Sequence, residues 1–274
     1  MTPPPPLPAL QGRRVLLAYG LAGEANRLLA PVGFNYMGAQ LRWLRSCGAD
    51  ARVVPVPTTA PVAANARRLA AAIQAGPGRC LVVAHSKGGL EALEALLDPA
   101  VAAQCDGLLA FQSPFAGSPM ADAFLRRRLL HRPTRWLAWL LRAGDMGGLP
   151  DLTVGGRAAW MAAHAAPLRA LLGQVPVLCV ASSLQPETAT GQDRMCLPLV
   201  RWMHQRGQGP NDALVSVASA LLPGARHLVL PGSHHGLVTT GPGRDPVGVL
   251  CRALPLLLSP VPAPLPAIPL PSGS

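Results

Sequence analysis

Short apolar runs alternate with segments of helical spacing along most of the chain. The apolar runs have the length and the continuous hydrophobicity of strands that are buried on both faces of a sheet. We expect strands over residues 14–19, 51–56, 80–84, 107–112, 175–182 and 226–230. The helical spacing is clearest over residues 37–47, 62–73, 90–97 and 247–258. Strands that alternate with helices predict an α/β fold with a mainly parallel sheet flanked by helices.

The interval between the fourth and fifth expected strands, about residues 114–174, is too long for a simple crossover. It is rich in arginine and carries the large aromatic residues Phe124, Trp136, Trp139 and Trp160. An insertion at this point of an α/β sheet favours a helical cap or lid over the sheet edge. A peripheral helical subdomain with no gating role is the alternative.

The two ends of the chain differ from its middle. Residues 1–12 and 259–274 are rich in proline, which removes backbone donors and opposes helices and central strands. We therefore expect a flexible leader, one domain over residues 13–258 and a proline-rich tail. Half of the residues are hydrophobic, which is sufficient for one large core.

The strongest chemical signal is the segment Ala84-His85-Ser86-Lys87-Gly88, between an expected strand and an expected helix. It fits the nucleophile-elbow pattern G-x-S-x-G, with alanine at the first glycine position. In such a turn the serine hydroxyl projects above the sheet. The residues two positions away must be small, because the backbones of strand and helix nearly touch there. Ser86 is therefore the candidate nucleophile, at the start of a helix whose amides can stabilise an oxyanion.

A nucleophilic serine of this kind needs an acid and a base later in the chain, in the order Ser, Asp, His. Asp212 precedes an apolar segment after the fifth expected strand, and His234 follows the last expected strand directly. His234 would take the proton from Ser86, and Asp212 would orient the imidazole and stabilise its charged form. His235 is the alternative base.

An oxyanion would also need two backbone N–H donors. One is expected from Lys87, directly after the candidate nucleophile. The other is expected from Leu21, in the glycine-rich loop that follows the first strand. That loop, residues 19–23, has neither the lysine nor the spacing of a phosphate-binding loop.

Four segments together resemble those of bacterial lipases and esterases of the α/β-hydrolase superfamily. They are the loop at 19–23, the elbow around Ser86, the segment 112–122 and the segment 211–221. The third is similar to the lipase segment A-P-H-x-G-S/T, and the fourth to N-D-G-L-V-S-V. The resemblance covers about residues 13–255.

The resemblance implies an α/β-hydrolase fold and a triad of Ser86, Asp212 and His234. Two positions depart from the family pattern. Tyr19 stands where the family has a histidine, and Ala84 replaces the first glycine of the elbow.

The activity that the resemblance implies is carboxylic-ester hydrolysis through an acyl-enzyme, with no cofactor and no metal. Acyl transfer or thioester hydrolysis on the same triad is one alternative, and a non-catalytic hydrolase-like scaffold is another. An apolar acyl group or a lipid ester fits the aromatic cap. The candidates for substrate contact are Tyr19, His85, Phe115, Trp136 and Trp139. For His85, packing beneath the cap is the alternative.

The charge and the cysteine content restrict the possible partners and cofactors of the protein. The formal net charge is +11, but no groove-reading motif or basic stretch with interleaved aromatic residues predicts nucleic-acid binding. A solvated basic surface is the simplest interpretation, and weak association with anionic lipid surfaces is the other. The six cysteines form no CxxC motif and no metal-ligand spacing with histidine. Because no signal peptide or membrane-spanning run is recognised, we expect a cytoplasmic protein.

Overall fold

A computed structural model describes residues 7–21, 36–130 and 147–259. Within them, parallel strands form a single sheet in the order β2-β1-β3-β4-β5-β6. The strands are β1 (Arg14–Ala18), β2 (Asp50–Val53), β3 (Cys80–His85), β4 (Cys105–Phe111), β5 (Val177–Ser183) and β6 (Arg226–Pro231). From β1 the chain goes outward to β2 and then crosses back to β3. The β1/β3 boundary is therefore the switch point at which parallel sheets usually hold their ligands.

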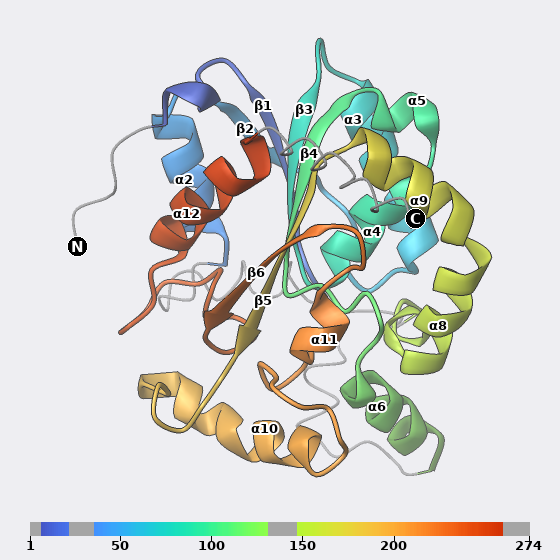
Figure 1. Cartoon of the computed structure of the whole chain (residues 1–274), viewed down its shortest axis with the longest axis vertical. Coiled ribbons are helices and arrows are strands. Elements are labelled where there is room, and N and C mark those ends of the chain that lie inside the picture. The colour runs from blue at the N-terminus through green and yellow to red at the C-terminus, as the bar shows by residue number, and fades with distance from the viewer. Residues whose placement is uncertain (1–6, 22–35, 131–146, 260–274) are drawn as a thin grey trace, which may run out of the picture.

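Helices cover both faces of the sheet (Figure 1). One face carries α2 (Gly38–Ser46) and α12 (Pro246–Leu258), and the other carries α3 (Val62–Gln74), α4 (Lys87–Ala95), α5 (Pro99–Ala102) and α9 (Ala165–Gln174). Side chains alternate across each strand. Val15 and Leu17 pack with α2 and α12, whereas Leu16 and Ala18 pack with α3 and α4. Two hydrophobic cores therefore sandwich the sheet.

The remaining elements are shorter or lie around the edges of the sheet. They are η1 (Pro8–Leu10), α6 (Pro119–Leu130), η4 (Pro150–Leu152), α8 (Val154–Ala163), η5 (Gly191–Cys196), α10 (Leu197–His204) and α11 (Val217–Ala220). Figure 1 shows α6, α10 and α11 beyond the carboxyl ends of the strands. These elements frame the end of the sheet at which Ser86 lies.

The expected fold class is confirmed, and every expected strand is present. Two element boundaries differ for physical reasons. β2 ends at Val53 instead of residue 56, because Pro55 and Pro57 have no N–H to donate to a neighbouring strand. α4 begins at Lys87, three residues before the apolar spacing predicts, because the turn at Ser86 leads directly into the helix.

The segment between β4 and β5 contains helices, as expected of the insertion. Part of it, residues 131–146 with Trp136 and Trp139, lies outside the described residues. α9, at the end of the segment, buries Leu168 and Leu171 in the core that also contains α3 and α4. In the structure α9 therefore belongs to the helical layer that covers the sheet. Of the described helices in this segment, α6 and α8 could still form a cap.

The folded domain begins before the expected start at residue 13. Pro8–Leu10 form the short helix η1, and the Leu10 side chain is fully buried against the α2 and α12 face. The N–H of Gly12 donates to the carbonyl of Gly48 at 2.9 Å. Residues 8–12, which the proline content assigned to a flexible leader, are thus held by one apolar anchor. All six cysteines are free thiols, and none of the described helices is long and apolar enough to cross a membrane.

The turn between β3 and α4 is possible only because small residues flank it. A Cβ atom added to Gly88 would lie 2.5 Å from the carbonyl oxygen of Ala18 and 2.8 Å from that of Tyr19. The backbones of α4 and β1 therefore meet at Gly88, as the elbow pattern predicts. Ala84, on the strand side, is fully buried, so the fold accommodates its methyl group at the first glycine position of the pattern.

We expect Gly88→Ala to lower the free energy of unfolding by about 1–3 kcal/mol, because the new methyl group forces backbone atoms of β1 and α4 apart. Gly155→Ala is the matched control: it also changes the second residue of a helix, α8, but its Cβ would have no atom within 4 Å. The control should be neutral or slightly stabilising. Urea unfolding of both variants measures the difference, and equal stabilities would contradict the close approach at Gly88.

Candidate active site

Ser86 occupies a strained turn between β3 and α4. Its backbone angles are φ 54° and ψ −125°, a region that residues other than glycine rarely adopt. Such a conformation costs about 1–3 kcal/mol and persists only where the surroundings hold it. The N–H of Ser86 donates to the carbonyl of Phe111 on β4 at 2.8 Å, and the N–H of Gly89 donates to the Ser86 carbonyl at 3.0 Å. The strain therefore sets the direction of a serine side chain at the switch point of the sheet.

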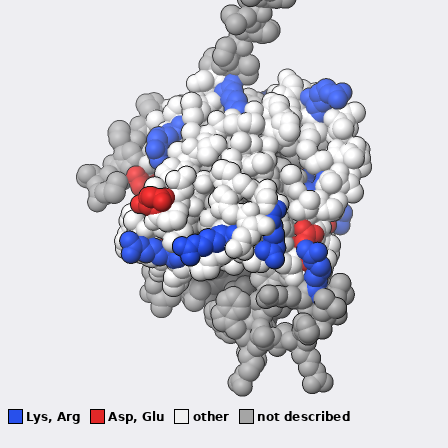
Figure 2. Space-filling model, turned by 60° about the horizontal axis from the view of Figure 1, so that its bottom comes forward, with Lys and Arg blue, Asp and Glu red and all other residues white. Residues whose placement is uncertain are grey.

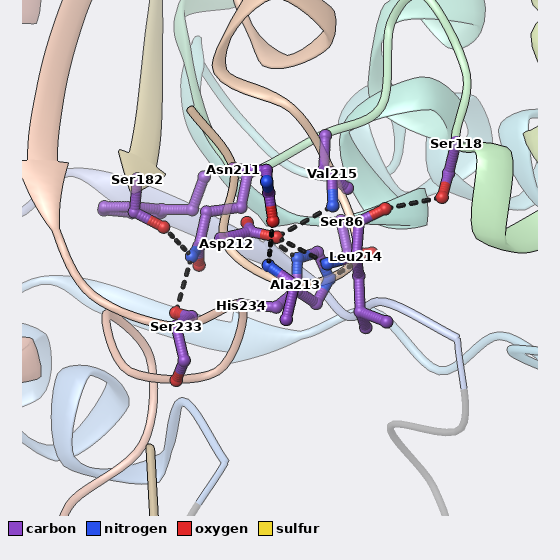
Figure 3. Close-up of polar contacts among 12 residues, drawn as sticks. Ser86, Ser118, Ser182, Asn211, Asp212, Ala213, Leu214, Val215, Ser233 and His234 are labelled. Carbon is purple, nitrogen blue, oxygen red and sulfur yellow. Dashed lines mark hydrogen bonds and ion pairs between the residues drawn. The ribbon is translucent and has the colours of Figure 1, made fainter. Parts of the chain in front are cut away.

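Two further candidate residues reach Ser86 from loops after β5 and β6. Nε2 of His234 lies 3.0 Å from Oγ of Ser86, and Nδ1 of His234 lies 3.0 Å from Oδ2 of Asp212 (Figure 3). Because a carboxylate only accepts, Nδ1 carries the proton of the neutral ring and Nε2 is free to accept from the serine. His234 is 5% exposed and Asp212 1% exposed. His234, and not its neighbour His235, is the histidine between the serine and the aspartate.

The Asp212 carboxylate is fixed by its own loop. Oδ1 accepts the N–H groups of Leu214 at 3.0 Å and Val215 at 2.8 Å, which leaves Oδ2 for the histidine (Figure 3). The loop turns sharply at Ala213, whose φ is 87°, and the Asn211 side chain accepts the Ala213 N–H at 3.0 Å. Buried amides thus orient the carboxylate.

Backbone contacts join the aspartate loop to the histidine loop and to the segment after β4. The N–H of His234 donates to the carbonyl of Asp212 at 2.9 Å. Ser118 donates from Oγ to the carbonyl of Leu214 at 2.5 Å, and Ser219 donates to the carbonyl of Gly117 at 2.6 Å. Two of the segments that carry the family resemblance, 112–122 and 211–221, therefore contact each other at the site, and the second also contacts the histidine loop.

The histidine loop is also anchored at Ser233, the residue before the candidate base. Gln112 donates from Nε2 to the Ser233 carbonyl at 2.8 Å. The Ser233 hydroxyl donates to Oδ1 of Asp193 at 2.6 Å. Arg244 donates to the same carboxylate oxygen at 2.5 Å and to Thr239, further along the loop, at 2.7 Å. A buried ion pair therefore holds the loop from one side while β4 holds it from the other.

A chain of hydrogen bonds runs beneath the site through Tyr36 and His85. The N–H of Gly20 donates to the Tyr36 hydroxyl at 2.9 Å, and this hydroxyl lies 2.5 Å from Nδ1 of His85. Nε2 of His85 lies 2.8 Å from the carbonyl of His234. Since a carbonyl only accepts, Nε2 carries the proton and Nδ1 accepts from the tyrosine. The chain thus connects the loop after β1 with the backbone of the candidate base.

The contacts of His85 require a neutral imidazole. Burial, and then the positive potential of His234 and His235, hold the pKa of His85 well below its usual range. Burial raises the pKa of Tyr36, so its hydroxyl keeps the proton that it donates. Both partners therefore have fixed protonation states near neutral pH, as a positioning contact needs.

The two expected oxyanion donors are near Ser86, each on a different segment. Lys87 is the first residue of α4, so its N–H has no carbonyl partner within the helix. Leu21 packs on the core of the α3 and α4 face. A Cβ added to Gly20 would lie 2.8 Å from Cβ of Ser86, so the loop that leads to Leu21 passes directly beside the serine.

The Lys87 side chain is directed away from any oxyanion and is fully buried. Its ammonium group forms an ion pair with Glu91, one helical turn later, and Asn65 donates to the same carboxylate at 2.7 Å. Burial raises the pKa of Glu91, and the charge of Lys87 opposes this shift. This ion pair stabilises the first turn of α4. Lys87 can therefore contribute only its backbone N–H near the serine.

The expected substrate contacts that the structure describes are buried side chains. Tyr19 is 6% exposed and packs edge-on against Tyr36 at 5.0 Å, His85 is 1% exposed, and Phe115 is 1% exposed in the main core. For His85 the structure shows packing beneath the site, the alternative to a place in the pocket. Trp136 and Trp139 lie outside the described residues.

Several contacts of the site carry no signal in the sequence. Tyr36 and His85 are 49 residues apart, and Asp193 and Arg244 are 51 apart. His85 lies within the elbow pattern, but nothing in that pattern indicates Tyr36 as its partner. Only the folded sheet brings the members of each pair together. Among the described residues, no group of three or more His, Cys, Asp or Glu side chains is arranged to hold a metal ion.

Comparison with solved structures identifies the architecture. A mature lipase of Bacillus licheniformis superposes with a TM-score of 0.66 at 20% identity, covering 87% of this chain and 91% of that one. A metagenomic carboxyl esterase gives a TM-score of 0.69 at 21% identity, over 89% of this chain and 74% of that one. The chain has the α/β-hydrolase fold.

A third solved structure, lipase 1 from Pelosinus fermentans, matches with a TM-score of 0.60 at 13% identity, over 92% of this chain and all of that one (100%). No protein-family model matches the sequence, and no curated protein matches it. The likeness to known lipases and esterases is therefore one of fold.

Burial of His235 predicts acid sensitivity. Burial, and then the positive charges of His234 and Arg244, lower the pKa of His235 to about 3. In the unfolded chain a histidine titrates near about 6.5. Between these values the unfolded state binds one more proton, so stability falls as the pH falls through this window. The contribution of this residue is about 1.4 kcal/mol per pH unit.

We expect His235→Asn to reduce the pH slope of the free energy of unfolding by about one proton between pH ~4 and ~6, measured by urea unfolding at several pH values. His204→Asn, a change at an exposed position of α10, is the control. An unchanged slope in His235→Asn would contradict the neutral state of this partly buried ring.

The hydrogen bond between Tyr36 and His85 predicts strong coupling between these residues. Tyr36→Phe should lower the free energy of unfolding by about 1–3 kcal/mol, because it leaves buried groups without a partner. His85→Leu should also destabilise. The double variant should lose less than the sum of the two, by about 0.5–3 kcal/mol. The same cycle with Tyr36→Phe and the distant change Asp106→Asn should be additive, and additivity in both cycles would contradict the contact.

Proposed function

We propose that this protein is a serine hydrolase that cleaves carboxylic esters through an acyl-enzyme. The observation that carries the proposal is the continuous hydrogen-bonded series from Oγ of Ser86 through His234 to Asp212, with both ring nitrogens at 3.0 Å from their partners. A serine, a histidine and a carboxylate in this geometry form the arrangement that activates a hydroxyl for acyl transfer. The fold that this chain shares with lipases and a carboxyl esterase supports the same reaction class.

Acylation would begin with proton transfer. His234 accepts the proton of the Ser86 hydroxyl at Nε2 while Oγ attacks the ester carbonyl carbon. Asp212 accepts a hydrogen bond from Nδ1 and stabilises the imidazolium that forms. The N–H groups of Lys87 and Leu21 are the proposed donors to the oxyanion, since one begins α4 and the other follows the glycine that packs against the serine.

Collapse of the tetrahedral intermediate would break the bond to the leaving alkoxide, which takes the proton from Nε2 of His234. Nε2 then takes a proton from a water molecule that attacks the acyl carbon. It returns this proton to Oγ of Ser86 as the bond between Oγ and the acyl carbon breaks and the acid leaves. The strained φ of Ser86 favours this cycle, because Oγ needs no rearrangement to face both the imidazole and the helix N-terminus.

Acyl transfer and thioester hydrolysis use the same residues and differ in the leaving group or the acceptor. A non-catalytic scaffold is less well supported. Binding alone requires neither a positive φ at Ser86 nor a buried carboxylate aligned with a histidine. The cap tryptophans that favour an apolar acyl group lie outside the described residues, so the proposal stays at carboxylic esters.

The test is covalent labelling with a fluorophosphonate probe. The unmodified protein should label, and Ser86→Ala should not. Ser183→Ala, a change in a partly exposed serine at the end of β5, two strands away from β3 in the sheet, should label as the unmodified protein does. A folded protein that fails to label would contradict the enzyme assignment.

The same labelling experiment distinguishes the roles of the two histidines. His234→Ala should slow labelling and p-nitrophenyl ester hydrolysis by at least about a thousandfold, because the general base is lost. His235→Ala should retain most of the activity. The reverse result would move the base to His235. Product analysis with an added alcohol distinguishes hydrolysis from acyl transfer, and a dominant ester product would favour a transferase.

A further inference from the structure

The segment formed by η5 and α10 exposes apolar side chains beyond the ends of the strands. Met195 is 76% exposed and Leu199 is 37% exposed, and Trp202 is partly exposed. Leu199 and Trp202 are three residues apart on α10, and Met195 is four residues before Leu199. This spacing places the three side chains along one side of the helical segment. We call this row the apolar stripe.

The charges around the apolar stripe are positive. Arg194, Arg201 and Arg206 are all exposed, and the guanidinium of Arg206 lies 3.8 Å from the ring centroid of Trp202. The acidic residue of the segment 191–206, Asp193, is buried and pairs with Arg244. No acidic side chain is therefore exposed between residues 191 and 206.

The wider surface at this end of the molecule has the same character. Figure 2 turns the lower end of Figure 1 toward the reader and shows arginine side chains spread across it, with fewer Asp and Glu side chains; the one lysine of the chain, Lys87, is buried. Because the opposite charges are sparse, the field of this face attracts anionic surfaces.

The segment is firmly attached to the candidate site. Val200 and Met203 fill the underside of α10 and are buried. Asp193, in η5, accepts the hydroxyl of Ser233 at 2.6 Å, directly before His234. The apolar stripe and the catalytic histidine loop are therefore parts of one rigid edge.

We propose that this face docks on anionic lipid surfaces. The apolar stripe would enter the boundary between headgroups and acyl chains, and the three arginines would contact lipid phosphates. Amphipathic segments bind membranes in this way when apolar area and basic charge coincide. Nucleic acid is the less suitable anion, because Met195 and Leu199 offer no ring on which a base can stack and the guanidinium of Arg206 covers one face of the Trp202 ring. The docking does not depend on the ester chemistry, but it would bring Ser86 to a lipid interface.

The experiment measures flotation with vesicles of phosphatidylcholine, with and without phosphatidylglycerol. All proteins carry Ser86→Ala, so lipid turnover cannot interfere and the outcome is separate from that of the hydrolase proposal. The paired change Met195→Ser with Leu199→Ser tests the stripe. Val229→Ser with Leu256→Ser, two other exposed apolar residues, is its control. Arg201→Gln with Arg206→Gln tests the charge, against Arg67→Gln with Arg68→Gln on the exposed side of α3.

Binding should require phosphatidylglycerol. It should fall at least about tenfold in the stripe variant, because the favourable free energy of transferring the two apolar side chains out of water is lost. The arginine variant should bind about 25-fold more weakly, which is about 1 kcal/mol for each charge near the surface. Both controls should bind as the parent does. Equal binding by the stripe variant and its control overturns the proposal, even where the arginine variant is weaker, because net charge alone then accounts for adhesion. Absence of binding by the parent protein also overturns it.

Discussion

The turn at Ser86 is the constraint on which the rest of the site depends. A serine with φ of 54° must be held there, and the neighbouring strands hold it through the bond from its N–H to Phe111. Gly88 allows α4 to pass over β1 at a distance that no side chain would permit. The position of Oγ is thus a property of the sheet and of one helix. The loops after β5 and β6 need only present a carboxylate and an imidazole to a fixed point.

Those loops are positioned largely by backbone groups. Asp212 is oriented by two amides of its own turn, and the carbonyl of His234 accepts from His85, which belongs to the strand that carries the serine. Residue 85 therefore connects β3 with the backbone of His234 through the interior, separately from the contact between Ser86 and His234. This arrangement explains why a histidine beside the serine is buried instead of lining a pocket.

The sequence determines these features unequally. The strands, the elbow and the order of serine, aspartate and histidine could be predicted, because each depends on residues that are adjacent in the chain or on a pattern with a fixed period. The partnership of Tyr36 with His85 could not, since nothing local in either segment requires the other. The expected flexible leader included residues that the structure packs against the domain, because a proline-rich segment gives no indication that Leu10 is buried. The assignment of α9 to the cap overlooked that its leucines complete the core of the sheet.

The distribution of charge separates the two regions of the molecule. In the proposed reaction His234 becomes an imidazolium, and unpaired cations nearby would disfavour this charged form. The two buried cations around the site are paired accordingly, Lys87 with Glu91 and Arg244 with Asp193. His85 stays neutral as well. Most of the other described arginines are exposed, where water screens them from His234 and where they remain available to an anionic surface. The buried Arg14 and Arg157 donate to backbone carbonyls instead. A strongly basic composition is thus compatible with the proposed proton transfer, because Lys87 and Arg244, which adjoin the site, each have a carboxylate partner.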